Sequence, residues 1–123
     1  MARPKLATYG DDEILARLEK ELPGWFLEDG WMRRRYKTDG WPTTLMLVNA
    51  IGYLAEAAGH HPDLTVTWAK VGVKLKTHHS GGVTDKDFEL AKKIEEAVLW
   101  RPAEGQALEG SPSKFVGPGA AGA

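Results

Sequence analysis

All four histidines of the chain lie within residues 56–87, as two adjacent pairs: His60 with His61, and His78 with His79. Imidazole titrates near neutral pH, so it can donate or accept a proton under physiological conditions, and it also binds metal ions. Four histidines scattered at random along 123 residues would rarely cluster in this way. This stretch is therefore the first candidate for a catalytic or metal-binding site.

The chain between the two pairs predicts two strands, because residues 64–68 and 71–77 alternate between apolar and polar side chains. A hairpin that turns between Ala69 and Lys70 would pair residues whose numbers sum to 139, which places the two histidine pairs opposite each other. Ala-Lys is a poor hairpin turn. If the segment is instead one long strand, the pairs lie at its opposite ends.

Three interpretations of the histidines compete. A metal site needs three or four ligands, but adjacent histidines rarely face one ion, and no His-x3-His or His-Glu-x2-His pattern occurs. A structural interpretation makes them loop residues that cap helices or satisfy carbonyl groups. A catalytic one makes them acid/base groups in a pocket walled by Pro62 and Trp68, with Glu56 or Asp87 orienting or tuning the imidazoles. Spacing alone leaves all three open.

Apolar residues at helical spacing predict three helices around this stretch. The first begins at a cap formed by Asp11 or Asp12, the second spans residues 42–58, and the third begins at Thr84 or Asp85 and ends near residue 99. The second helix is apolar on two sides, so we expect it to be buried both against a sheet and against a partner subunit.

An Asp29-Gly30 pair between aromatic-rich segments predicts a further hairpin. The element order is then helix, two strands, helix, two strands, helix. This order predicts an α+β fold, a four-stranded antiparallel sheet with three helices packed on one face.

Length and composition predict a single domain over residues 10–102, with a flexible arm over 1–9 and a Gly/Ala/Pro-rich tail over 103–123 whose apolar anchor is Phe115-Val116. With 16 basic and 17 acidic residues, the chain has no overall field that would attract nucleic acid or an anionic membrane. The absence of cysteine excludes disulfides, thiol nucleophiles and the usual structural zinc sites. No apolar run has signal-peptide or membrane-span length, so we expect a cytoplasmic protein.

A fixed-gap pattern connects the histidines to more distant residues. The pattern E-x3-H-H-P-x5-W-x9-H-x8-D is filled at every position and resembles the signature of the pterin-4a-carbinolamine dehydratases; its residues are Glu56, His60, His61, Pro62, Trp68, His78 and Asp87. The runs L-P-G-W at 22–25 and T-H-x-x-G-G-x-T-x-x-D at 77–87 are similar to the same family. The resemblance covers about residues 10–99.

The resemblance implies a lyase that converts 4a-hydroxytetrahydropterin to quinonoid dihydropterin, a step that recycles tetrahydrobiopterin for aromatic amino acid hydroxylases. It implies no metal and no cofactor, because the pterin is the substrate. His60 and His78 would be general acid/base groups, and His61 would hold the hydroxyl-bearing part of the pterin. Glu56 and Asp87 would orient these groups, while Pro62 and Trp68 would form walls. His79 stands outside the pattern and is expected to be a neighbour.

The resemblance also implies a homodimer or homotetramer. The alternative is a non-catalytic role, because the same fold is similar to proteins that serve as a dimerisation partner of a transcription factor or as a RuBisCO assembly factor in carboxysomes. The assembly proteins look as if they have lost the His-His-Pro residues. This chain retains them at 60–62, which favours an enzyme.

Overall fold

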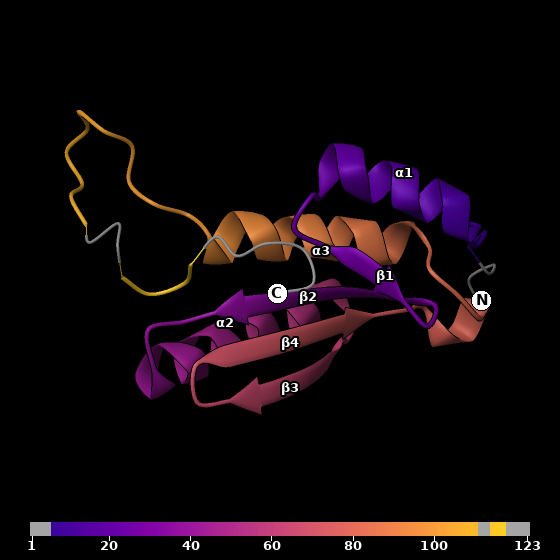
Figure 1. Ribbon diagram of the computed structural model, residues 1–123, viewed down its shortest axis with the longest axis horizontal. Helices are drawn as coiled ribbons and strands as arrows, with labels where there is room; N and C mark the ends of the chain where they lie inside the picture. The colour runs from indigo at the N-terminus through magenta and orange to yellow at the C-terminus, as the bar shows by residue number, and fades with distance from the viewer. Residues whose placement is uncertain (1–5, 111–113, 118–123) are drawn as a thin grey trace.

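The computed structural model describes residues 6–110 and 114–117, and its element order confirms the predicted α+β fold (Figure 1). The elements are α1 (Asp11–Glu21), β1 (Phe26–Glu28), β2 (Trp31–Lys37), α2 (Trp41–Ala58), β3 (Asp63–Thr67), β4 (Lys70–Leu75), the short 3-10 helix η1 (His78–Ser80) and α3 (Asp85–Val98). The strands form one antiparallel sheet in the order β1-β2-β4-β3.

The sheet has one buried face and one open face because its strands alternate. In β2 the buried residues are Met32, Arg34 and Tyr36, and in β4 they are Val71, Val73 and Leu75. The helices cover this face, and α2 and α3 lie behind the sheet in the view of Figure 1. No helix in the part of the chain that the structure describes is long and apolar enough to cross a membrane.

The first hairpin forms as its turn residues predict. Asp29 and Gly30 both have positive φ, 53° and 80°, which a two-residue turn between twisted antiparallel strands requires. Gly30 adopts this conformation without steric cost, and aspartate is among the few other residues that tolerate it. β1 and β2 therefore meet at the Asp-Gly pair.

The second hairpin also forms, but the predicted register is wrong. The turn is Trp68-Ala69, and Lys70 already pairs with Thr67 as the first residue of β4. Paired residues of β3 and β4 therefore sum to 137, as in Thr65 with Gly72. Because the sum changes by two, every side chain keeps its face of the sheet. The histidine pairs still flank the open end of the hairpin.

The cap of α1 also differs from the prediction. The cap is Gly10, and Asp11 and Asp12 are the first two helical residues. The backbone N–H of Gly10 donates to Glu13 Oε1 at 3.0 Å. Three carboxylates thus fill the first turn, where the positive end of the helix dipole favours them.

Parts of the predicted arm and tail pack against the domain. Tyr9 donates its hydroxyl to Asp85 at 2.6 Å and packs edge-on against Phe88, with ring centroids 5.6 Å apart. Val116 is buried and forms an isolated bridge with Thr38 beside the end of β2. Residues 1–5, 111–113 and 118–123 of the predicted arm and tail lie outside the described residues.

One carboxylate of α3 connects the helix layer to the sheet. Glu95 Oε1 accepts from Arg34 Nε at 2.8 Å, from the Tyr36 hydroxyl at 2.6 Å and from Trp25 Nε1 at 3.2 Å. The Arg34 side chain is only 1% exposed, and the Glu95 carboxylate offsets its buried positive charge. Burial, together with the nearby Glu95 carboxylate, raises the pKa of Tyr36, which keeps its hydroxyl a donor.

We expect Glu95→Ala to lower the free energy of unfolding by about 2–4 kcal/mol, because it leaves the buried Arg34 guanidinium without the carboxylate that faces it. The matched control is Glu96→Ala, which removes only an exposed contact to Lys93 and should cost less than about 1 kcal/mol. Urea unfolding of both variants measures the difference, and equal losses would contradict the structural role of Glu95.

Candidate active site

The sequence-predicted histidines gather at the end of the sheet where β3 begins and β4 ends. His60 and His61 follow Gly59, which ends α2 in the left-handed conformation with φ 65°. A glycine suits that position because it carries no Cβ, and the chain can then turn directly into the loop. His78 begins η1, three residues after the end of β4. The hairpin thus delivers both pairs to the same edge.

His60 is held by Asp87, at the start of α3. The distance from His60 Nε2 to Asp87 Oδ1 is 2.6 Å, and the two side chains are 13% and 0% exposed. Because a carboxylate oxygen accepts, this contact places a proton on Nε2 and leaves Nδ1 as the ring nitrogen that could meet a ligand. The pairing gives His60 a fixed orientation in a largely water-excluded position.

The second oxygen of Asp87 ties the same carboxylate to the backbone. Asp87 Oδ2 accepts from the Thr84 N–H at 2.9 Å and from the Thr77 hydroxyl at 2.8 Å. The first of these bonds belongs to the capping box of α3, for which Thr84 is the predicted cap. Asp87 therefore both begins the helix and orients the histidine.

Thr77 is a site-building residue that sequence reasoning missed. Its hydroxyl lies 2.7 Å from that of Thr84, and its backbone N–H donates to the Gly82 carbonyl at 2.9 Å. These bonds close the loop over residues 77–84, which carries His78. The available signal was the T-H-x-x-G-G-x-T-x-x-D run, in which both threonines occur.

His61 forms a second histidine–carboxylate pair, and this one is exposed. Its Nε2 lies 2.8 Å from Glu56 Oε1, with side-chain exposures of 64% and 81%. Glu56 lies in the last turn of α2, so the helix end and the following loop bring the two together. An exposed ion pair of this kind contributes little to the stability of the fold. The orientation of His61 would therefore become fixed only when a bound molecule covers the pair.

His78 lies against Trp31, the first residue of β2. The two rings meet edge-on, with centroids 5.2 Å apart and an interplanar angle of 73°. Trp31 belongs to the open face of the sheet, so His78 marks the border between the histidine cluster and that face. Trp31 is a second neighbour of the site that the sequence pattern did not single out. His79 is exposed and lies next to His78 in η1.

The two predicted wall residues, Pro62 and Trp68, lie in different parts of the structure. Pro62 is half-buried in the loop between His61 and β3, within the cluster. Trp68 is exposed in the β3–β4 turn, where its carbonyl accepts from the Thr44 hydroxyl at 2.9 Å. The five residues of β3, about 16 Å of chain, separate it from the histidines. Within a single chain Trp68 therefore lies away from the histidines, and its role as a wall of the site stays a prediction.

The site suits proton transfer by its own side chains. The His60–Asp87 and His61–Glu56 pairs are separate, and no group of three or more His, Asp or Glu residues in the described ranges could hold a metal ion. One buried pair, one exposed pair and a third imidazole can together donate and accept protons near neutral pH.

Comparisons with known proteins identify a family to which the chain is similar. A family model described as pterin 4 alpha carbinolamine dehydratase matches residues 7–97. A protein of Aquifex aeolicus is 47% identical over 88 residues, which cover 72% of this chain and 88% of the relative. One of Roseiflexus castenholzii is 41% identical over 92 residues, covering 75% and 98%. Both carry the name pterin-4-alpha-carbinolamine dehydratase on a provisional basis.

A solved structure from Brucella melitensis, described as a transcriptional coactivator/pterin dehydratase, resembles the fold with a TM-score of 0.67 at 27% identity. The match covers 72% of this chain and 96% of that one.

We expect Asp87→Ala to disturb both the helix and the histidine. Loss of the cap acceptor should lower the free energy of unfolding by about 1–3 kcal/mol, measured by urea unfolding. In the intact protein, neutral His60 should carry its proton on Nε2, and the variant should lose this preference in nitrogen-15 NMR of the ring. The control is Glu89→Ala on the exposed side of α3, which should leave both readouts nearly unchanged. An unchanged His60 tautomer in Asp87→Ala would contradict the orienting role.

Proposed function

The chain belongs to the pterin 4 alpha carbinolamine dehydratase family, and we propose that it is an active member that removes water from a 4a-hydroxytetrahydropterin. The observation that carries the proposal is the His60–Asp87 contact at 2.6 Å, a half-buried imidazole held by a fully buried carboxylate next to two further histidines. Acid/base catalysis requires an imidazole held in a fixed orientation, and this contact provides one.

The proposed reaction needs two proton movements. The bond between the 4a carbon and its hydroxyl oxygen breaks, and the oxygen leaves as water after it receives a proton. The adjacent ring nitrogen loses its proton as the carbon–nitrogen double bond of the quinonoid dihydropterin forms. A protonated and a neutral imidazole can supply and remove these protons near pH 7, and each such group typically contributes about 10²–10⁴ in rate.

We assign His60 and His78 to these acid/base roles. Asp87 supports the assignment of His60 because it occupies Nε2 and leaves Nδ1 for the substrate. His61, held by Glu56, would bind the hydroxyl-bearing part of the pterin. Its exposed position fits a group that a bound substrate covers, and the covered charge pair would then interact more strongly.

We expect the purified protein to accelerate dehydration of a 4a-hydroxytetrahydropterin, followed by absorbance in a stopped-flow instrument. His60→Ala, His61→Ala and His78→Ala should each lower kcat/KM by on the order of a hundredfold. His79→Ala is the matched control, since it removes an imidazole from the same turn, and it should retain most of the activity.

An intact protein with no acceleration would refute the enzymatic proposal. A non-catalytic member of the family that binds or assembles another protein would then be the better interpretation. Full activity in all three variants would refute the histidine mechanism alone.

We also propose that the protein forms a homo-oligomer through α2. This helix exposes large apolar side chains along its outer side, namely Trp41, Leu45, Met46 and Tyr53. Its only charged residue is Glu56, in the last turn. A contiguous apolar surface of this kind typically marks a protein–protein contact.

Sedimentation velocity tests this surface. The wild type should sediment as a dimer or tetramer, and Met46→Glu with Tyr53→Glu should shift it toward the monomer by burying charge in the contact. Leu15→Glu changes an exposed apolar residue on α1 and should leave the assembly intact. A monomeric wild type would rule out the proposal.

A further inference from the structure

The open face of the sheet concentrates positive charge in a chain whose net charge is only −1. Strand alternation places six cations on or directly beside this face and only two carboxylates, Glu28 and Asp63; the cations are Arg33, Arg35, Lys37, Lys70, Lys74 and Lys76. Much of the compensating negative charge lies on the helices α1 and α3. The face is thus strongly basic although the whole molecule is not.

This arrangement opposes stability. The register of β2 with β4 places Arg33 directly opposite Lys74 and Lys37 directly opposite Lys70. Like charges in directly opposed positions destabilise a sheet, so neither pair helps the fold. Glu28 forms an ion pair with Arg33, and Asp63 lies directly opposite Lys74 in β3, so these two carboxylates offset part of the repulsion. An anionic ligand would remove the remainder, which suggests a functional reason for the charge.

The basic face begins at the candidate active site. Lys74 Nζ lies 4.4 Å and Lys76 Nζ 5.5 Å from the centre of the Trp31 ring. The His78 imidazole contacts the same ring, at 5.2 Å between centroids. A single indole therefore separates two ammonium groups from an imidazole that we assign to catalysis.

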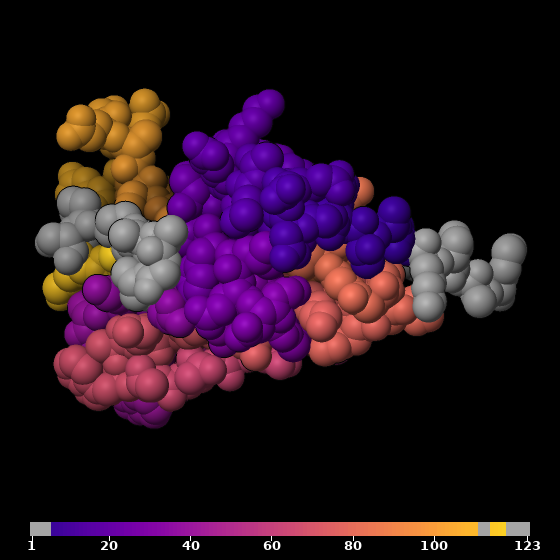
Figure 2. All heavy atoms as spheres, turned by 45° about the vertical axis from the view of Figure 1, so that its right-hand side comes forward, coloured from indigo at the N-terminus to yellow at the C-terminus, as the bar shows by residue number. Residues whose placement is uncertain are grey.

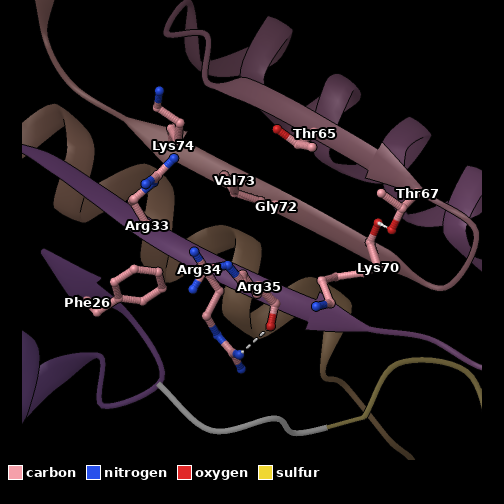
Figure 3. Close-up of a pocket in the computed structure, with 10 residues that line it drawn as sticks. All are labelled: Phe26, Arg33, Arg34, Arg35, Thr65, Thr67, Lys70, Gly72, Val73 and Lys74. Carbon is pink, nitrogen blue, oxygen red and sulfur yellow. Dashed lines mark hydrogen bonds between the residues drawn. The ribbon is translucent and has the colours of Figure 1, made fainter. Parts of the chain in front are cut away.

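A hollow of about 210 Å³ continues from this point across the sheet (Figure 3). Arg33 and Lys74 lie at one end of it and Lys70 at the other, while Thr65 and Thr67 supply hydroxyls along the β3 side. Gly72 lies between these ends, and because it has no side chain it leaves the hollow open there. The hollow can accept an extended, polar group.

We infer that the substrate is a pterin whose ring substituent carries negative charge, as a phosphate or a carboxylate, and that Lys74 and Lys76 bind this group. The inference rests on the proposed function, because it places the pterin ring at the histidines and its substituent beside Trp31. A neutral hydroxyalkyl substituent would add no negative charge beside the ammonium groups of Lys74 and Lys76. Near these groups lie the Trp31 ring and, opposite Lys74 in β3, Asp63. A negatively charged substituent would lie beside these ammonium groups at the entrance of the hollow, and a longer substituent would reach Lys70.

The test compares 4a-hydroxytetrahydropterins that differ only in the end group of the ring substituent: hydroxyl, carboxylate or phosphate. We expect kcat/KM at low salt to be about tenfold higher for the preferred anionic substrate than for the neutral one. The preference should fall toward unity in about 0.5 M salt, where exposed charges are screened. The carboxylate and phosphate arms identify which anion the site favours.

Lys74→Gln with Lys76→Gln should reduce the preference to less than about threefold. The matched control is Lys20→Gln with Lys93→Gln, which removes two exposed charges from α1 and α3 and should keep the preference. An equal preference in both double variants would overturn the assignment of Lys74 and Lys76.

Binding of fully oxidised, unreactive pterins with the same three end groups, measured by calorimetry, separates the two proposals. If no substrate is dehydrated but the anionic pterins bind more tightly, the catalytic proposal fails and the charge preference stands. If all three substrates react equally well and all three oxidised pterins bind equally, the proposed function stands and the inference fails.

Discussion

One buried carboxylate, Asp87, holds the candidate site together. Its two oxygens meet the imidazole of His60, the hydroxyl of Thr77 and the backbone N–H of Thr84. A carboxylate with no exposed surface needs such partners, since an unpaired buried charge is costly. The same bonds that begin α3 therefore fix the histidine, and the helix cannot shift at its start without moving the imidazole.

Glu95, about two turns further along α3, makes a second connection between this helix and the sheet. Residues eight apart differ by about 80° around a helix, so Asp87 and Glu95 lie within one broad face of α3. Glu95 meets Arg34 and Tyr36 of β2, while Asp87 meets the loop that follows β4. The helix is thus fixed to two central strands by charged groups at both ends, and hydrophobic packing fills the interval between them.

The elements of the fold could be predicted from the sequence because local chemistry determines them: alternation predicts the strands, Asp29-Gly30 the first turn, and Thr84 or Asp85 the cap of the third helix. The second turn could not be placed, because neither Trp68-Ala69 nor Ala69-Lys70 has typical turn residues and both keep the same faces. The fixed-gap pattern also could not show that a whole strand, β3, lies between Trp68 and His61, because it records sequence spacing alone. The pairing of His60 with Asp87 spans 27 positions and depends on how α3 returns to the sheet, so no local rule predicts it.

The second hairpin also influences the order in which the site can assemble. It joins His61 to His78 through two short strands and a two-residue turn, and contacts between neighbouring strands of this kind close quickly because little chain entropy is lost. Asp87 comes from the last helix, so its contact with His60 needs both the closed loop over 77–84 and α3 in place on the domain. The imidazoles are brought to one end of the sheet by a local hairpin, whereas the carboxylate partner of His60 depends on the whole fold. The His60–Asp87 pair is therefore complete only when the domain is complete.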